Sequence, residues 1–320
     1  MPEHTDTLIT HAYLLTMQGD GVGYIADGAV AVQGDRIAAV GTTDELSTRF
    51  QAAERIDASD CAVLPGLIDA HMHTTLSIVR GVAQDVKHWM QKALAPYSRH
   101  ITHEARVAAT KLNALEALKA GTTTQCDYGG IYEGWAEFYN QSGIRARLAP
   151  IFNALPPGGM AGWTVGDLYP FDLEHGHRAM ARAVEFCRAW NGAAEGRITT
   201  MLGAHAPDMM PVEMLLEAKE IGQREGWMLH VHVAQGDREI EQRVKRYGKR
   251  TIPLLDEIGY LDAQLLAVHL TEATDEEAAL VARRGARMAL CSGSIGIIDG
   301  IVPPARAFKE TGGLVALGSD

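Results

Sequence analysis

The chain has 320 residues, of which 47% are hydrophobic and 22% are charged, and its formal net charge is -11. This length can bury a large core, either as one α/β barrel with a small appendage or as two ordinary domains. Phosphate binding needs a clustered positive field, so nucleic acid is a disfavoured partner for so acidic a chain.

The cysteines and the first residues are typical of a cytoplasmic protein. The four cysteines lie far apart without a C-x-x-C pair, which suits reduced thiols better than a disulfide framework or a structural zinc site. Residues 1–17 carry acids where a signal peptide would be basic, and their apolar run is short. No stretch approaches the length of a membrane span, so we expect no membrane partner.

Short strands dominate the beginning of the chain. Apolar segments at 8–17, 28–41 and 54–64 are separated by turn residues, including the pair Gly34 and Asp35. We therefore expect a small β-domain over residues 1–62, an incomplete part of a β-sandwich.

From residue 63 onward, apolar strands alternate with helical stretches. One helix is expected at 103–120, and a second at 274–284 begins with a capping box formed by Thr274 and Glu277. The strands are expected at 63–73, 122–128, 146–153, 198–206, 227–234, 265–270, 287–293 and 314–320.

Eight apolar strands, all but the last followed by a helix, fit a (β/α)8 TIM barrel better than an open doubly wound sheet. This barrel would occupy residues 63–320. Because the chain stops at Asp320, directly after the eighth strand, we expect a C-terminally truncated barrel whose last helix is missing.

The basic run at 238–250 does not favour a polyanion site. Glu239 and Glu241 interrupt it at helical spacing, which is typical of a solvated helix face.

Histidines gather where the expected strands end, at the end of a barrel where active sites are built. His71 and His73 lie two apart on strand one, so both can face the barrel axis and bind one ion. The others are His205 on strand four, His230 and His232 on strand five, His269 on strand six and Asp320 after strand eight. A single histidine could equally be a satisfied interior or rim residue, but the set together predicts a site for zinc, or for ferrous iron.

Several motifs resemble the amidohydrolase superfamily, within it the branch of cytosine deaminases, guanine deaminases and triazine hydrolases. They are "LPGLIDAHMHTT", "GTTTQCD", "LHVHVAQ", "LLAVHLTEAT" and "VALGSD". The resemblance implies a metal-dependent hydrolase that attacks a C–N bond of a nitrogen heterocycle with metal-activated water. It also implies a small-molecule substrate and a homo-oligomeric enzyme, a dimer.

The resemblance assigns the metal ligands to His71, His73, His232 and Asp320. His230 lies on the same face as His232, but relatives place the ligand three residues before an acidic position, which selects His232. Asp320 would also be the catalytic base.

Three further residues take roles from the resemblance. His269 would be the second catalytic residue, contacting the metal, its water or the substrate. His205 matches a substrate-contacting histidine and could equally be a rim residue, while Trp89 resembles a lid tryptophan and could equally be a core aromatic.

One divalent ion is expected, zinc before iron. Binuclear relatives bridge two ions with a lysine from a middle strand, and this chain has no lysine between Lys119 and Lys219.

Two positions depart from the branch. Gln235, a substrate-binding candidate, stands where deaminases usually carry a Glu that shuttles a proton, and an amide cannot titrate. The segment 291–295 reads Cys-Ser-Gly-Ser-Ile where relatives tend to read Cys-Pro-x-Ser-Asn. An amidase that opens a cyclic amide or ureide, and a non-catalytic metal-binding relative, therefore remain as alternatives.

Overall fold

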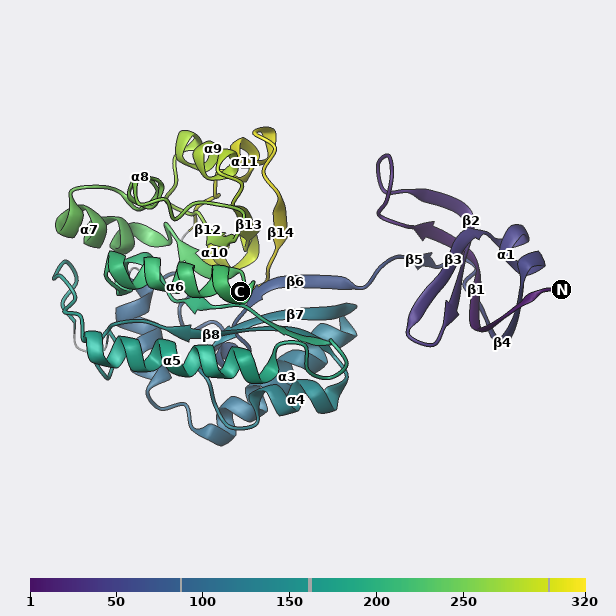
Figure 1. Cartoon of the computed structure of the whole chain (residues 1–320), viewed down its shortest axis with the longest axis horizontal. Coiled ribbons are helices and arrows are strands. Elements are labelled where there is room, and N and C mark those ends of the chain that lie inside the picture. Colours follow the sequence, from purple (N-terminus) through teal and green to yellow (C-terminus); the bar gives the residue numbers. More distant parts are fainter. Residues whose placement is uncertain (87, 161–162, 299) are drawn as a thin grey trace. The chain divides into compact units, whose positions relative to one another are not determined.

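The computed structural model describes residues 1–86, 88–160, 163–298 and 300–320 (Figure 1). Their contacts divide the chain into two compact units, residues 1–66 and residues 67–320. No helix in these ranges is long and apolar enough to cross a membrane.

The first unit is a five-stranded sheet with one short helix. Its elements are β1 (Glu3–Leu15), β2 (Tyr24–Gln33), β3 (Arg36–Thr42), α1 (Thr43–Arg49), β4 (Phe50–Asp57) and β5 (Ala62–Val63). The strand order is β3-β2-β1-β4, with β5 also paired to β1. The turn between β2 and β3 contains Gly34 at a φ of 59°, as the Gly34-Asp35 pair predicts.

The second unit contains strands at all eight predicted positions. They are β6 (Leu67–Met72), β7 (Thr122–Gly129), β8 (Arg145–Phe152), the split fourth strand β9 (Ile198–Thr200) and β10 (Gly203–Ala204), β11 (Leu229–Val233), β12 (Leu265–His269), β13 (Arg287–Leu290) and β14 (Val315–Leu317). Every strand pair is parallel, as a β/α alternation requires.

Backbone hydrogen bonds join the two halves of this sheet into a barrel. Leu202 forms a parallel bridge with Leu229, and the His230 N–H donates to the Leu202 carbonyl at 2.8 Å. At the other junction, the Asp320 N–H donates to the His71 carbonyl at 2.9 Å. The predicted fold, a (β/α)8 barrel and a small N-terminal β unit, is therefore confirmed.

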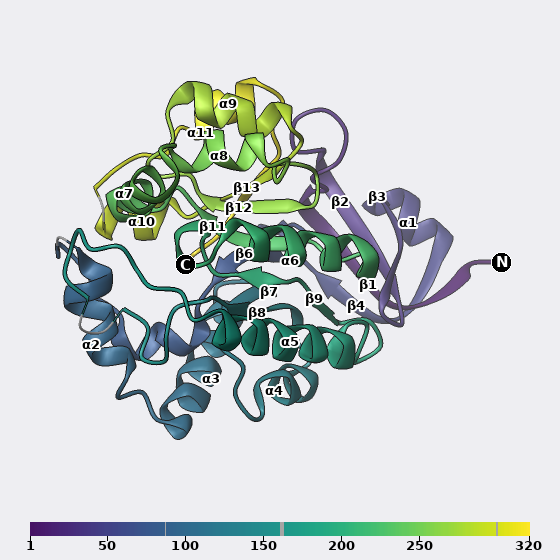
Figure 2. The ribbon, with the colours of Figure 1, turned by 60° about the vertical axis from the view of Figure 1, so that its left-hand side comes forward.

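Helices lie along the outside of the strands (Figure 2). The main ones are α3 (His103–Lys119), α4 (Trp135–Ser142), α5 (Leu173–Trp190), α6 (Val212–Glu225), α7 (Gly236–Tyr247), α8 (Thr251–Glu257), α9 (Asp275–Arg283), α10 (Ser292–Ile298) and α11 (Ala305–Glu310). The unit also contains the short helical segments η1 (Thr74–Val79), η2 (Met90–Leu94), α2 (Ala95–Ser98) and η3 (Pro207–Met209). The predicted capping box is present, because Thr274 Oγ1 accepts from Glu277 N–H and the Glu277 carboxylate accepts from Thr274 N–H.

Apolar side chains fill the barrel in two layers. The larger core lies between the strands and the outer helices and includes Phe152, Leu215 and Phe308. A smaller cluster contains residues from strands around the barrel, among them Ala149 and Val268. The polar cluster described below is built on these same strands.

The interpretation of residues 238–250 as a solvated face is wrong for one side of α7. Glu239, Gln242 and Arg243 are buried there. The Glu239 carboxylate accepts the backbone N–H groups of Ala234 and Gln235 at 2.7 and 3.0 Å. The helix is therefore anchored to the turn that follows β11, a role that charge spacing alone does not reveal.

Candidate metal centre

Four side chains from three strands converge at one end of the barrel. They are His71, His73, His232 and Asp320, and one ligand atom from each lies within 4.8 Å of the others. His71 lies in β6 and His73 directly follows that strand, His232 lies in β11, and Asp320 follows β14. The structure thus brings together the four ligands that the resemblance assigned.

The spacing of these atoms suits a single ion. Asp320 Oδ1 lies 3.2 Å from the Nε2 atoms of both His71 and His73, and His232 Nε2 lies 3.2 Å from His71 Nε2. Ligands at about 2.0–2.1 Å from a tetrahedral zinc ion are about 3.3 Å apart. The donor set and its geometry therefore fit a mononuclear zinc-type site.

Outer hydrogen bonds orient two of the ligands. His73 Nδ1 donates to the Tyr128 carbonyl at 2.8 Å, which leaves its Nε2 lone pair directed at the cluster. Asp320 Oδ2 accepts from Ser294 Oγ at 2.6 Å. Ser294 belongs to the altered strand-seven segment, which therefore still braces the site through a hydroxyl group.

Burial keeps most of the imidazoles neutral. It lowers the pKa of His71, and it holds the pKa of His232 well below the usual value, together with the charges of neighbouring histidines. For His73, burial also opposes protonation, but the hydrogen bond to Asp320 and its charge raise the pKa. Burial would raise the pKa of Asp320, yet His269 and the bonded histidines hold it well below its usual value. Neutral imidazole and ionised carboxylate are the states that bind a metal.

His269 faces the same cluster without a hydrogen-bond partner. Both of its ring nitrogens are buried and unpaired among the described residues, and its ring stacks on His232 at 5.0 Å between centroids. Burial lowers its pKa to about 3, and its backbone has a strained φ of 78°. A buried imidazole whose two nitrogens have no protein partner can contact a bound ion, water or substrate.

His205 also lies against the cluster. Its ring centroid is 5.6 Å from that of His232, its Nδ1 lies 3.1 Å from Asn153 Nδ2, and burial lowers its pKa to about 3. Its half-buried position leaves both the substrate-contact role and the rim role open.

Gln235 and Trp89 line a common cavity of about 340 Å³. Its wall combines apolar side chains with charged ones, the latter being Asp85, Asp237, Arg238 and Glu272. Gln235 lies three residues after His232 in the sequence, whereas the four ligand candidates are not among the described residues that line this cavity. Ligand cavities in proteins commonly have this size and mixed lining.

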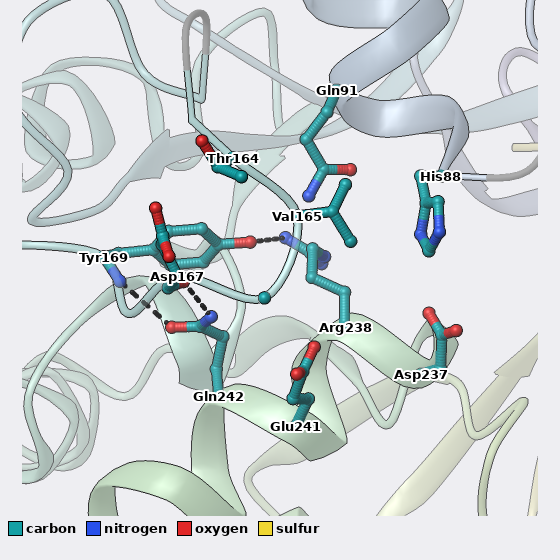
Figure 3. A pocket seen from close by; sticks show the side chains of 11 residues that line it. His88, Gln91, Thr164, Val165, Asp167, Tyr169, Asp237, Arg238, Glu241 and Gln242 are labelled. Atoms are coloured by element: carbon teal, nitrogen blue, oxygen red, sulfur yellow. Dashed lines mark hydrogen bonds between the residues drawn. The ribbon is translucent and has the colours of Figure 1, made fainter.

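A second depression nearby is too small for a substrate. It measures about 10 Å³, and Figure 3 shows its side chains bonded to one another. Gln242 bridges the Tyr169 N–H and the Asp167 carbonyl at 3.1 and 2.7 Å, and Arg238 donates to the Tyr169 hydroxyl at 3.5 Å. These contacts have a structural role between α7 and the loop before α5.

Sequence reasoning missed residues that hold the ligands in place. Asp69 accepts from the N–H and the hydroxyl of Ser319 at 3.0 and 2.5 Å, which fixes the segment carrying Asp320. His230, rejected as a ligand, instead places its Nε2 2.7 Å from His71 Nδ1. The alternation of β6 would have placed Asp69 on the same face as His71, but nothing in the sequence signals its partner.

Comparison with known proteins identifies the family to which this site belongs. The profile of the amidohydrolase family matches residues 62–320, and that of the bacterial imidazolonepropionase-like composite domain matches residues 28–50. A 5'-deoxyadenosine deaminase of Methanosarcina mazei is 33% identical over 257 residues, which cover 80% of this chain and 55% of the relative. A 5-methylthioadenosine/S-adenosylhomocysteine deaminase of Pelotomaculum thermopropionicum is 31% identical over 316 residues, covering 98% of this chain and 69% of the relative. The chain thus spans about half the length of the deoxyadenosine deaminases it matches.

Solved structures of deaminases and related hydrolases resemble this chain in fold. An adenosine deaminase from Xanthomonas campestris with bound zinc has a TM-score of 0.87 at 28% identity, covering 100% of this chain and 70% of that chain. A zinc complex of atrazine chlorohydrolase from Arthrobacter aurescens has a TM-score of 0.79 at 20% identity, covering 98% and 71%, which is a likeness of fold. Since the family profile matches residues 62–320 and two relatives exceed 30% identity, the chain belongs to the amidohydrolase family.

Proposed function

We propose that this barrel binds one zinc ion through His71, His73, His232 and Asp320 and hydrolyses a C–N bond of an aminated nitrogen heterocycle. The observation that carries the proposal is the convergence of these four ligand atoms within 4.8 Å. The zinc-bound deaminase structure and the deaminase relatives support the same reaction class.

The residues around the cluster can take separate catalytic roles in such a reaction. A bound divalent ion would lower the pKa of water to about 7 and so supply a nucleophile at neutral pH. Asp320, ionised and bonded to Ser294, would accept the proton of that water and return it to the departing amine. His269, neutral and without a partner, can orient the water or donate to the oxyanion.

We propose an adenine nucleoside as the substrate class, because the relatives deaminate such compounds. The cavity of about 340 Å³ has room for a ligand of that size. Trp89 offers a ring that could stack on a base, and Gln235 offers an amide that can hydrogen-bond to a ring nitrogen.

Gln235 also favours a second candidate. The Gln235 amide cannot carry a proton from the water to the ring of the substrate. The alternative reaction is therefore the opening of a cyclic amide or ureide. In that reaction the nitrogen leaves after another acid has protonated it.

The decisive experiment is a substrate panel with ammonia detection. The purified chain, loaded with zinc and checked by elemental analysis, is offered aminated purines, nucleosides, pyrimidines, pterins and triazines, together with cyclic amides and ureides. We expect one zinc per chain and ammonia release without ring opening. Ring opening without ammonia would support the second candidate, and zinc binding without any turnover would overturn both.

His73→Ala tests the site itself. Losing one of the inward-facing ligands should abolish turnover and weaken zinc binding more than 100-fold, beyond the roughly 10–100-fold that outer partners usually cost. The fold should persist, because the core is built from apolar strand residues. The exposed His103 provides the control His103→Ala, and full activity of the His73 variant would reassign the site.

We also propose a cytoplasmic location and a homodimeric enzyme. All four cysteines are free, and three of them are buried, which suits a reducing compartment. Light scattering of the purified protein gives the oligomeric state directly.

A further inference from the structure

Behind the metal cluster, two fully buried imidazoles are hydrogen-bonded to each other. His71 Nδ1 and His230 Nε2 lie 2.7 Å apart, and both side chains are 0% exposed. The two rings are tilted by 55°, with their centroids 4.9 Å apart. A hydrogen bond between two neutral imidazoles needs one protonated and one unprotonated nitrogen, so the pair must choose between two tautomeric arrangements.

The metal cluster decides between these arrangements. His71 Nε2 lies 3.2 Å from both Asp320 Oδ1 and His232 Nε2, so it needs its lone pair for the ion. The ring proton of His71 must then be on Nδ1, and this N–H donates to His230 Nε2. His230 in turn carries its own proton on Nδ1.

The other nitrogen of His230 is consistent with this assignment. His230 Nδ1 is buried and has no hydrogen-bond partner among the residues that the structure describes. The ring of Tyr128 lies 4.6 Å from that of His230, centroid to centroid, which holds the imidazole in place.

His73 shows the ordinary solution to the same problem. Its Nδ1 donates to a backbone carbonyl, that of Tyr128, at 2.8 Å. Ligating histidines usually donate to a carboxylate, a carbonyl or water, and this outer bond fixes both the tautomer and the ring orientation. For His71, the acceptor of this outer hydrogen bond is the imidazole of His230. This acceptor is neutral and adds no charge to the site.

We propose that His230 is a positioning residue that fixes the tautomer and orientation of His71 by accepting its Nδ1–H. His230 thereby sets the affinity of the centre for its ion without binding the ion itself. The inference rests on the proposed function, because it assigns the second partner of a proposed metal ligand.

Two substitutions separate the hydrogen bond from the packing. His230→Leu fills similar space without an acceptor, whereas His230→Gln can present an amide oxygen near the position of Nε2. His4→Leu, at an exposed position of β1 in the other unit, is the control. Zinc affinity is measured for each protein by competition with a chromophoric chelator, and melting temperatures are compared.

We expect His230→Leu to bind zinc about 10–100-fold more weakly than the unsubstituted chain, and His230→Gln to recover most of that loss. Equal zinc affinities of the Leu variant and the unsubstituted chain would overturn the inference while leaving the proposed function intact. Equally weak binding by both variants would also overturn it, because packing alone would then explain the loss. A chain that binds no zinc would overturn the proposed function, and the inference with it.

A measurement on the unsubstituted protein keeps the test independent of variant folding. Long-range ¹H–¹⁵N correlation spectra of the ¹⁵N-histidine-labelled zinc protein report which nitrogen of each ring carries the proton. We expect a protonated Nδ1 on both His71 and His230. A protonated Nε2 on His230, with its Nδ1 unprotonated, would overturn the assignment.

Discussion

Gln235 stands where the family resemblance predicts a glutamate. Its side chain is buried and lines the same cavity as the carboxyl-bearing Asp85, Asp237 and Glu272. A glutamate at this position would add negative charge where the cavity is already acidic. It would also repel the electron-rich edge of a heterocycle to which an amide can donate a hydrogen bond.

We therefore expect Gln235→Glu to lower kcat/KM, by on the order of tenfold, a change of about 1.4 kcal/mol. The pH–rate profiles of both forms on the substrate found by the panel provide the measurement. A faster variant whose profile gains a new ionisation would show instead that this protein is a weakened ordinary deaminase.

A buried carboxylate on β7 connects this strand to the end of β6 and to α4. The carboxylate of Asp127 is 1% exposed and accepts four hydrogen bonds. Two come from Thr74, through its N–H and its hydroxyl, at 3.1 and 2.6 Å. The others come from Trp135 Nε1 and the Tyr139 hydroxyl on α4, at 2.7 and 3.1 Å. Since Thr74 directly follows His73, this carboxylate fixes the end of β6 at the metal cluster.

Asp127→Asn should therefore weaken both the fold and the site. The amide replaces one acceptor oxygen by a donor that faces other donors, which costs about 1–3 kcal/mol or more. We expect the free energy of unfolding to fall by that amount, in urea titrations, and zinc affinity to fall with it. The exposed Asp60 supplies the control Asp60→Asn. An unchanged free energy of unfolding and zinc affinity in Asp127→Asn would contradict the role of these four hydrogen bonds.

The junction of β11 and α7 should make stability depend on pH. Burial and the charge of Asp208 raise the pKa of Glu239 from 4.5 to about 7, against the hydrogen bonds from the N–H groups of Gln235 and Ala234. A carboxyl group whose pKa is higher in the folded state binds more protons there than in the unfolded chain. Its contribution to stability is therefore complete below about pH 4.5 and is lost as the pH rises through about 7.

We expect the titration of this group to reduce the free energy of unfolding as the pH rises from about 4.5 to about 8. Glu239→Gln, which cannot titrate, should remove that part of the pH dependence. Urea titrations at several pH values give the comparison, with Glu241→Gln on the half-exposed side of the same helix as control. Parallel pH curves for Glu239→Gln and the unsubstituted chain would contradict the assignment.

At the same scale, the sequence predicted the elements better than their buried polar contacts. All eight barrel strands lie where apolar runs predict them, because a parallel strand is apolar on both faces. The convergence of the four candidate ligands could also be predicted, from the strand ends and the family motifs. The burial of Glu239 and the pairing of His230 with His71 could not be predicted, because they depend on side chains from elements far apart in the sequence.

For the molecule as a whole, charge should govern which substrates enter. The chain carries a formal net charge of -11, and Asp85, Asp237 and Glu272 line the cavity. Arg238, the lining guanidinium, already lies 3.2 Å from the buried carboxylate of Asp208. An anionic group on a substrate would therefore approach carboxylates without an available guanidinium.

For the proposed adenine nucleoside substrate class, we expect the kcat/KM of adenosine 5'-monophosphate to be at least about tenfold below that of adenosine. The difference should narrow as salt is added, because screening weakens repulsion at exposed charges. Steady-state kinetics of both compounds at two ionic strengths test this. Equal efficiency at low salt would show that a cation near the mouth neutralises the phosphate.

The bond between the Asp320 N–H and the His71 carbonyl, described above as the closure of the barrel, has a thermodynamic consequence. His71 and Asp320 are separated by 249 positions, so the unfolded chain must close a very long loop before they meet. An ion that is bound by both residues binds only the folded, closed barrel. It therefore stabilises the whole barrel against unfolding. At a free concentration 100 times its dissociation constant, such an ion adds about 2.7 kcal/mol to the stability of the folded chain. Metal supply would then change the stability of the folded barrel as well as the fraction of the protein that is active.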